Sequence, residues 1–429
     1  KSLPDAQLCT QLITGQGEAT NIALAREILQ RWQTKNEEDR LQFLQMLASD
    51  FDPDPGAVQE AVNNYKVEDY SSLQQLLEVA EPLRQELLRR LNMAPNGTSV
   101  LVEMRAFLLQ HLKQYPDLNK LDYDFQHLLS SWFNRGFLSL QRIDWDSPAS
   151  ILEKLIKYEA VHPMAGWHDL HRRLASDRRC FAFFHPALPK DPLIFVEVAL
   201  TDTMSHSIAP LIDPESLEFD TSQAHTAIFY SINNALMGLR GVSFGNFLIK
   251  QVASELHKEF PGLTLFATLS PVPMLRKYIE SVDPDVIEQL IGDALVSLRS
   301  SSQQEEITVV IDTLINQLDE IDEDTRKLLE GSLQKLALYY LTGAKRNHKA
   351  YDPLMHFHLS NCARLERINI FANLSEYGRK QSWGCMVNDR YDSTQIVANH
   401  EAYVCSGHIS MSKDLERRFK SLELGSTSE

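Results

Sequence analysis

The chain has 429 residues, enough for two or three domains, and its 43% apolar and 23% charged content is typical of a soluble globular protein. Forty-two basic against 58 acidic side chains give a net charge of −16, which argues against a nucleic-acid or anionic-membrane binder, since these need a basic face. No apolar run approaches the roughly 18 residues of a membrane span. The five cysteines lack C-x-x-C spacing, which predicts reduced thiols and a cytoplasmic protein.

Residues 1–135 show helical periodicity and almost no strand signal. Apolar residues recur at i, i+3, i+4 and i+7 with charges between them, as on amphipathic helices. The segments that carry this pattern are NIALAREILQRW (21–32), DRLQFLQMLASDF (39–51), SLQQLLEVAEPLRQELLRRL (72–91) and SVLVEMRAFLLQHLKQY (99–115). We predict an all-helical domain over residues 1–135 with a structural or oligomerising role.

From residue 136 the pattern changes to a mixed α/β domain that we extend to residue 429. Strands are predicted at CFAFFH (180–185), PLIFVEVALT (192–201), TAIFYSIN (226–233) and LTLFATLS (263–270). A helix over residues 244–260 separates the last two strands, so that they form a βαβ unit. Residues 279–345 return to helical periodicity and predict a helical insertion, after which mixed strand character resumes to about residue 391.

The loop that opens the βαβ helix reads GLRGVSFGN (238–246). A glycine-bearing turn at a helix N-terminus presents free backbone N–H groups and the positive end of the helix dipole, which can cradle a pyrophosphate. The loop lacks the Gly-Lys-Ser/Thr of a P-loop and the G-x-G-x-x-G of a dinucleotide site. An ordinary structural turn is therefore the alternative interpretation.

Ser270 ends the predicted strand 263–270 and is followed by Pro271 and Pro273. Ligands of a βαβ unit lie at the carboxyl ends of its strands, which makes this hydroxyl a candidate for substrate contact. It lacks the G-x-S-x-G motif of an α/β-hydrolase, so a turn residue is the alternative.

His356 and His358 stand two residues apart in HFHLSN, which we interpret as strand. On a strand they would share one face, and zinc would be conceivable with Cys362 or His348 as a further ligand. We favour the simpler interpretation, in which one histidine is functional or part of the core and its neighbour is incidental.

Several separated blocks together resemble malonyl-CoA decarboxylase. They are EAVHPMAGW (159–167), RRCFAFFH (178–185), PLIFVEVALT (192–201), the segment 227–278 and DPLMHFHLSNCARLERIN (352–369), within a match that runs from about residue 130 to 392. The resemblance implies an N-terminal helical domain that mediates oligomerisation into a dimer or tetramer, and a C-terminal domain similar to the GNAT acetyltransferase fold. It also implies conversion of malonyl-CoA to acetyl-CoA and CO2 without a cofactor or metal, since the CoA belongs to the substrate.

The resemblance places catalytic residues at Ser270 and His358, both also touching substrate, and an active-site tyrosine at Tyr391. It places the CoA-contacting turn on Arg240, Gly241, Val242, Ser243, Phe244, Gly245 and Asn246. Ser243 departs from the glutamate of the family, which leaves a supporting role unfilled or taken by another residue. A GNAT-type CoA-dependent acyltransferase and a non-catalytic malonyl-CoA-binding regulator are the alternative functions.

Overall fold

The structure is a computed structural model that describes residues 3–242, 248–392 and 394–422. The chain forms two compact units. The first comprises Lys1–Ser139, Phe183–Ile194 and Asn234–Gly245, and the second comprises Leu140–Ala182, Phe195–Asn233 and Asn246–Glu429. No helix in the described ranges is long and apolar enough to cross a membrane.

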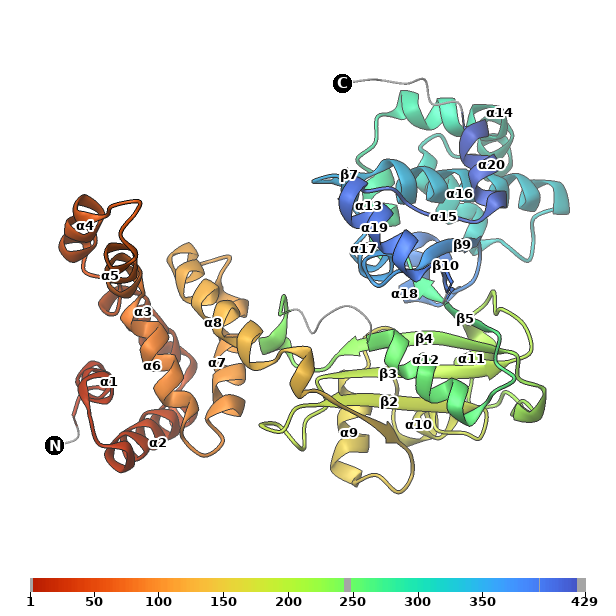
Figure 1. Ribbon diagram of the computed structural model, residues 1–429. Coiled ribbons are helices and arrows are strands. Elements are labelled where there is room, and N and C mark those ends of the chain that lie inside the picture. Colours follow the sequence, from red (N-terminus) through yellow and green to blue (C-terminus); the bar gives the residue numbers. More distant parts are fainter. Residues whose placement is uncertain (1–2, 243–247, 393, 423–429) are drawn as a thin grey trace. The chain divides into compact units, whose positions relative to one another are not determined.

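The first unit is built from α-helices, as predicted for the N-terminal region (Figure 1). Trp32, Leu44 and Leu101 are among the residues of its buried core. Polar caps mark where helices begin: Asn36 and Asp54 accept backbone N–H groups, which satisfies donors that have no partner within the helix. The helices are α1 (Asp5–Thr14), α2 (Glu18–Thr34), α3 (Glu37–Asp50), α4 (Pro55–Asn64), α5 (Tyr70–Ala80), α6 (Leu83–Asn92), α7 (Gly97–His111) and α8 (Asn119–Trp132).

A buried arginine ties the helices of the first unit together. Arg84 of α6 is 4% exposed and pairs with Asp124 of α8 and with Asp52, which follows α3. A buried guanidinium requires such partners because an unpaired charge is costly away from water. Arg84 therefore has a structural role within the helical unit.

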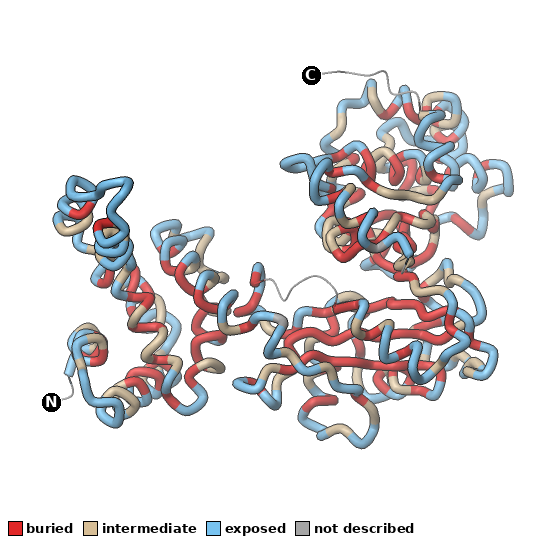
Figure 2. The backbone as a smooth tube through the Cα atoms, in the orientation of Figure 1, coloured by how far each residue is buried: buried red, intermediate tan, exposed pale blue. Residues whose placement is uncertain are grey.

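The second unit contains most of an eight-stranded sheet with the order β1-β2-β3-β4-β5-β10-β6, and β9 pairs with β10. Strands β2 and β3 are buried almost throughout (Figure 2), which explains their continuous apolar sequence. The strands are β1 (Ser139–Ile143), β2 (Arg178–Phe184), β3 (Ile194–Thr201), β4 (Thr226–Asn234), β5 (Leu265–Thr268), β6 (Ser270–Pro271), β9 (Arg364–Asn369) and β10 (Met386–Tyr391).

The predicted βαβ unit is present. Strands β4 and β5 are parallel, and α12 (Leu248–Glu259) connects them. Val252 and Leu256 of α12 are buried, as the apolar face of the helix requires. Strand β10 then pairs antiparallel with β5 on its other side. The sheet is therefore mixed, and its middle strands come from distant parts of the chain.

The predicted helical insertion is also present, followed by a segment that the sequence analysis assigned wrongly. The insertion forms α14 (Pro284–Ser302), α15 (Ile307–Asn316) and α16 (Glu323–Gly343). Residues 353–360, expected as strand, form α17 (Pro353–Ser360). The other helices of this unit are α9 (Ala149–Tyr158), α10 (Trp167–Arg173), α11 (Ala209–Ile212), α13 (Leu275–Ile279), α18 (Glu376–Ser382), α19 (Ile396–Ser406) and α20 (Lys413–Ser421), and a hairpin pairs β7 (Lys345–Arg346) with β8 (Lys349–Ala350).

Local chemistry explains why α17 is a helix. The Asp352 carboxylate accepts the backbone N–H groups of Leu354 and Met355, each at 3.0 Å. Pro353 occupies the first helical turn, where its fixed φ favours the helix and its missing N–H costs nothing. Asp352 also accepts the hydroxyl of Tyr340 at 2.9 Å, which anchors the start of α17 to the insertion.

Candidate active site

Ser270 lies where the sheet changes partners. It opens β6 and pairs with Val387 of β10, while Pro271 pairs with Met386. Pro271 has no N–H to continue the ladder, which is why the strand ends at once. The pairing with β10 holds Ser270 in a defined position, and its side chain is largely buried, with 6% of the residue exposed.

His358 connects two other predicted site residues. It lies in the last turn of α17 and is 3% exposed. Its Nε2 lies 3.0 Å from Oγ of Ser270, and its Nδ1 lies 2.8 Å from the hydroxyl of Tyr391, the final residue of β10. The structure thus brings Ser270, His358 and Tyr391 into one hydrogen-bonded chain.

His356 does not share this environment. On a helix, residues two apart point in different directions, and Nδ1 of His356 lies 2.7 Å from the hydroxyl of Tyr403 on α19. The expectation that His356 and His358 share one face is therefore wrong, because the segment is helical. The two histidines therefore have different hydrogen-bond partners.

Burial keeps the imidazole of His358 and the phenol of Tyr391 neutral. Desolvation lowers the pKa of His358 to about 3. Desolvation also raises the pKa of Tyr391 well above its usual value, with smaller contributions from Asp389 and Cys362. A neutral imidazole carries a proton on one nitrogen and accepts at the other, so His358 can bridge two hydroxyl groups.

Asp389 is a buried acid near Tyr391, and the sequence analysis missed it. It stands two residues before Tyr391 on β10, so both side chains project from the same face. The hydroxyl of Thr268 donates to Oδ2 of Asp389 at 3.2 Å and accepts its backbone N–H at 3.0 Å. Within the described residues, Oδ1 has no hydrogen-bond partner. The sequence feature that could have indicated Asp389 is an acidic residue inside the strand-like segment CMVNDRY.

The protonation of Asp389 predicts a pH dependence of stability. Burial raises the pKa of Asp389 to about 7, whereas an unfolded aspartate loses its proton near pH ~4. The folded protein therefore binds more protons across this window, and its stability falls as pH rises from about 4 to 7. Asp389→Asn lacks this contribution. We expect its Tm, relative to that of the wild type, to rise as pH increases from about 4 to 7. Tm–pH curves that run parallel would contradict the assignment.

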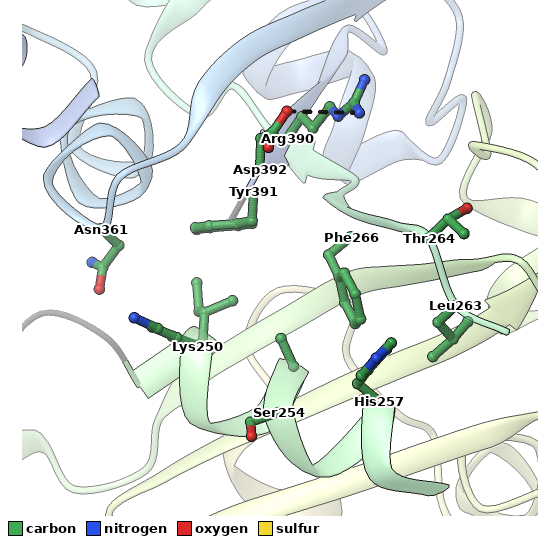
Figure 3. Close-up of a pocket in the computed structure, with 12 residues that line it drawn as sticks. Lys250, Ser254, His257, Leu263, Thr264, Phe266, Asn361, Arg390, Tyr391 and Asp392 are labelled. Carbon is green, nitrogen blue, oxygen red and sulfur yellow. Dashed lines mark ion pairs between the residues drawn. The ribbon is translucent and has the colours of Figure 1, made fainter. Parts of the chain in front are cut away.

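A pocket of about 340 Å³ adjoins Tyr391. Figure 3 shows Lys250, Ser254 and His257 following one another along α12, with Phe266 of β5 beside them. The pocket combines an apolar wall with basic side chains, which suits a ligand that has both apolar and anionic parts. Its lining residues are Ile249, Lys250, Ala253, Ser254, His257, Leu263, Thr264, Phe266, Asn361, Arg390, Tyr391 and Asp392.

The predicted CoA-contacting turn is described only in part. Arg240 is exposed, Gly241 has a φ of 79°, and Val242 is buried. These residues belong to the first unit, whereas Ser270, His358 and Tyr391 belong to the second. The remaining predicted positions of the turn, Ser243, Phe244, Gly245 and Asn246, lie outside the described residues.

Comparisons with known proteins identify the family of this chain. Residues 136–428 match the model of the malonyl-CoA decarboxylase C-terminal domain, and residues 51–133 match that of its N-terminal domain. The mitochondrial malonyl-CoA decarboxylase of Anser anser anser is 36% identical over 399 residues, which cover 88% of this chain and 79% of that protein.

Solved structures agree in the same way. The crystal structure of malonyl-CoA decarboxylase from Rhodopseudomonas palustris is 43% identical with a TM-score of 0.87, covering 96% of this chain and 98% of that one. The enzyme from Agrobacterium vitis is 43% identical with a TM-score of 0.85, covering 98% and 100%. The class defined by these matches is a carboxy-lyase, an enzyme that removes a carboxyl group. The chain belongs to the malonyl-CoA decarboxylase family.

Proposed function

We propose that this protein converts malonyl-CoA to acetyl-CoA and CO2 without a cofactor, at the site formed by Ser270, His358 and Tyr391. The observation that carries the proposal is the hydrogen-bonded chain in which His358 links the two hydroxyl groups, at 3.0 Å and 2.8 Å. Family membership supports the substrate.

The chemistry needs a place for two electrons and a source of one proton. When the bond between the α-carbon and the carboxylate breaks, CO2 leaves and its bonding pair stays on the α-carbon. The thioester carbonyl can take up that pair as an enolate, which fixed hydrogen-bond donors stabilise. A proton delivered to the α-carbon then completes acetyl-CoA. The residues must therefore hold the carboxylate, stabilise the enolate and supply the proton.

The geometry supports a distinct task for each residue. The phenol of Tyr391 donates to Nδ1 of His358, which leaves the proton of the imidazole on Nε2, facing Ser270. The Ser270 hydroxyl accepts from Nε2 and directs its own proton to the carboxylate or thioester of the substrate. His358 then gives the Nε2 proton to the α-carbon. Tyr391 supplies a replacement proton to Nδ1, so a neutral imidazole can act as the acid. A proton from solvent then restores the phenol, which accounts for the one proton that each turnover consumes.

One assay tests this function against its alternatives. Incubation of the protein with malonyl-CoA should release acetyl-CoA and CO2 in equal amounts. Acetyl transfer from acetyl-CoA to an amine or alcohol, with no CO2 from malonyl-CoA, would instead identify an acyltransferase. Tight binding of malonyl-CoA with no turnover would identify a regulator.

We also propose that the turn from Arg240 to Asn246 contacts the phosphates of CoA. The positive φ of Gly241 and the exposed side chain of Arg240 support this assignment for the described part. The pocket beside Tyr391, with Lys250 and His257 in its lining, offers further basic groups to the substrate.

The homo-oligomer expected from the family remains a proposal, and exposed apolar residues of the helical region support it. Val67, between α4 and α5, is 87% exposed. Tyr70, the first residue of α5, is 78% exposed. Leu77 of α5 is 63% exposed. Large exposed apolar side chains that lie near one another in sequence are suited to an interface, here between copies of the helical domain over residues 1–135.

A double variant tests that interface. Val67→Glu with Tyr70→Glu should shift the protein to a smaller species in sedimentation velocity, because a buried unpaired carboxylate opposes association. Tyr123→Glu is the matched control, since Tyr123 of α8 is 69% exposed in the same unit. An unchanged sedimentation coefficient in the double variant would place the interface elsewhere.

The cytoplasmic location also remains a prediction. All five cysteines are free thiols, which suits a reducing compartment. The curated relative from Anser anser anser is named as mitochondrial. Fractionation of the cells that produce this protein would decide the compartment.

A further inference from the structure

Two helices of the N-terminal region hold the main chain that leads into the proposed CoA-contacting turn. Nη1 of Arg105, on α7, donates to the carbonyl oxygens of Gly238 and Arg240, each at 2.8 Å. Arg105 is only 2% exposed. These contacts lie within the first unit, which contains both the helices and the described part of the turn.

A second helix completes this arrangement. Asp122 of α8 accepts from Nε of Arg105 at 2.8 Å and so fixes the direction of the guanidinium. One turn further along α8, Nε2 of Gln126 donates to the carbonyl oxygen of Gly241 at 2.8 Å. Side chains from α7 and α8 therefore donate hydrogen bonds to the carbonyl oxygens of Gly238, Arg240 and Gly241.

The backbone also approaches α7 too closely for any side chain at Gly238. A Cβ atom there would lie 1.8 Å from the carbonyl oxygen of Val102, a distance no real contact reaches. Leu239 and Val242, in the same segment, are also buried. The segment is thus fixed by packing as well as by hydrogen bonds, while the side chain of Arg240 stays exposed.

The held carbonyls determine where the neighbouring donor points. A trans peptide places its N–H opposite its C=O. Because the carbonyl of Arg240 points to Arg105, the N–H of Gly241 points away from α7. The charge of Arg105 is balanced by Asp122, so Arg105 serves to orient the main chain and is not itself available to an anion.

We propose that Arg105 and Gln126 are positioning residues for CoA, through which the N-terminal helices set the affinity of the enzyme for its thioester substrate. The proposal rests on the proposed function and concerns only the described part of the CoA-contacting turn, residues 240–242. It assigns the helical region a direct part in substrate binding, in addition to any role in assembly.

The test compares two variants with the wild type. Arg105→Lys keeps the charge but loses the planar fork that reaches two carbonyls and Asp122. Gln126→Leu removes one hydrogen bond at a partly exposed position. We expect KM for malonyl-CoA, and Kd for CoA measured by calorimetry, to rise about 2- to 10-fold for Gln126→Leu and more for Arg105→Lys. We expect kcat to stay within about two-fold, because the reacting groups are untouched.

Arg84→Lys is the matched control. Arg84 is also buried in the same helical unit, at 4% exposed against 2% for Arg105, and it is ion-paired to Asp124 and Asp52. Its substitution should lower Tm and leave Kd for CoA unchanged. A rise in Kd as large as that of Arg105→Lys would show a general effect of destabilisation and overturn the proposal.

Other outcomes are equally decisive. Unchanged KM and Kd in Gln126→Leu would overturn the proposal, even if Arg105→Lys fails to fold. A fall in kcat at constant Kd would also overturn it. If the wild type binds CoA but releases no CO2 from malonyl-CoA, the proposed function fails, whereas the comparison of Kd values still tests the positioning role.

Discussion

His358→Asn is expected to lower the rate of CO2 release from saturating malonyl-CoA by about 10²–10⁴-fold, the usual cost of removing a positioned acid. Asparagine can still donate a hydrogen bond toward Ser270, but it cannot pass a proton from the phenol of Tyr391 to the α-carbon. Its amide is similar in size to the imidazole, so the buried site stays filled. The measurement is the initial rate of CO2 and acetyl-CoA formation.

The neighbouring histidine provides the control for this variant. His356 lies on the same helix and bonds Tyr403, so His356→Asn perturbs α17 without touching the hydrogen-bonded chain. We expect its kcat to stay close to that of the wild type. Unchanged turnover in His358→Asn, at full occupancy by substrate, would remove His358 from the mechanism.

Ser270→Ala is expected to lower kcat by about 10²–10³-fold, comparable to the loss of one donor to a developing oxyanion. In the proposed step, the Ser270 hydroxyl accepts the Nε2 proton of His358 in a hydrogen bond and directs its own proton to the substrate. Without it, the reactive orientation of the carboxylate is less populated and the enolate loses a donor. Steady-state kinetics will separate this effect from a loss of affinity.

A buried serine elsewhere in the unit controls for the missing hydroxyl. Ser382 is 2% exposed, and its Oγ donates to the carbonyls of Gly378 and Cys385. Ser382→Ala should cost stability and leave kcat intact. If Ser270→Ala raises only KM, Ser270 is a binding residue and the proposed step must be revised.

The periodicity of the sequence was sufficient to predict much of the fold. The amphipathic helices of the first unit and the apolar strands β3 and β4 carry strong, long patterns, and the structure contains them. The single strand predicted over residues 263–270 is instead two short strands, β5 and β6. The pattern was too short at HFHLSN, where alternation over a few residues fits a strand or a helix equally well. Asp352 and Pro353 at the start of α17 were the signals that distinguished them.

The site could not be assembled from spacing alone. Ser270 and His358 are 88 positions apart and His358 and Tyr391 are 33 apart, so only the fold brings them together. The resemblance to a family supplied these positions, and the geometry then supplied the reason for their proximity. Asp389 was missed because sequence does not distinguish an acid buried in a strand from one that faces solvent.

The pairing of β10 with β6 has a consequence for biosynthesis. The ribosome adds Ser270 first and His358 88 residues later, and the strand that pairs with Ser270 and carries the phenol for His358 is added after both. Premature termination before residue 391 would therefore yield a chain that has the serine and the imidazole but an unfinished reaction centre.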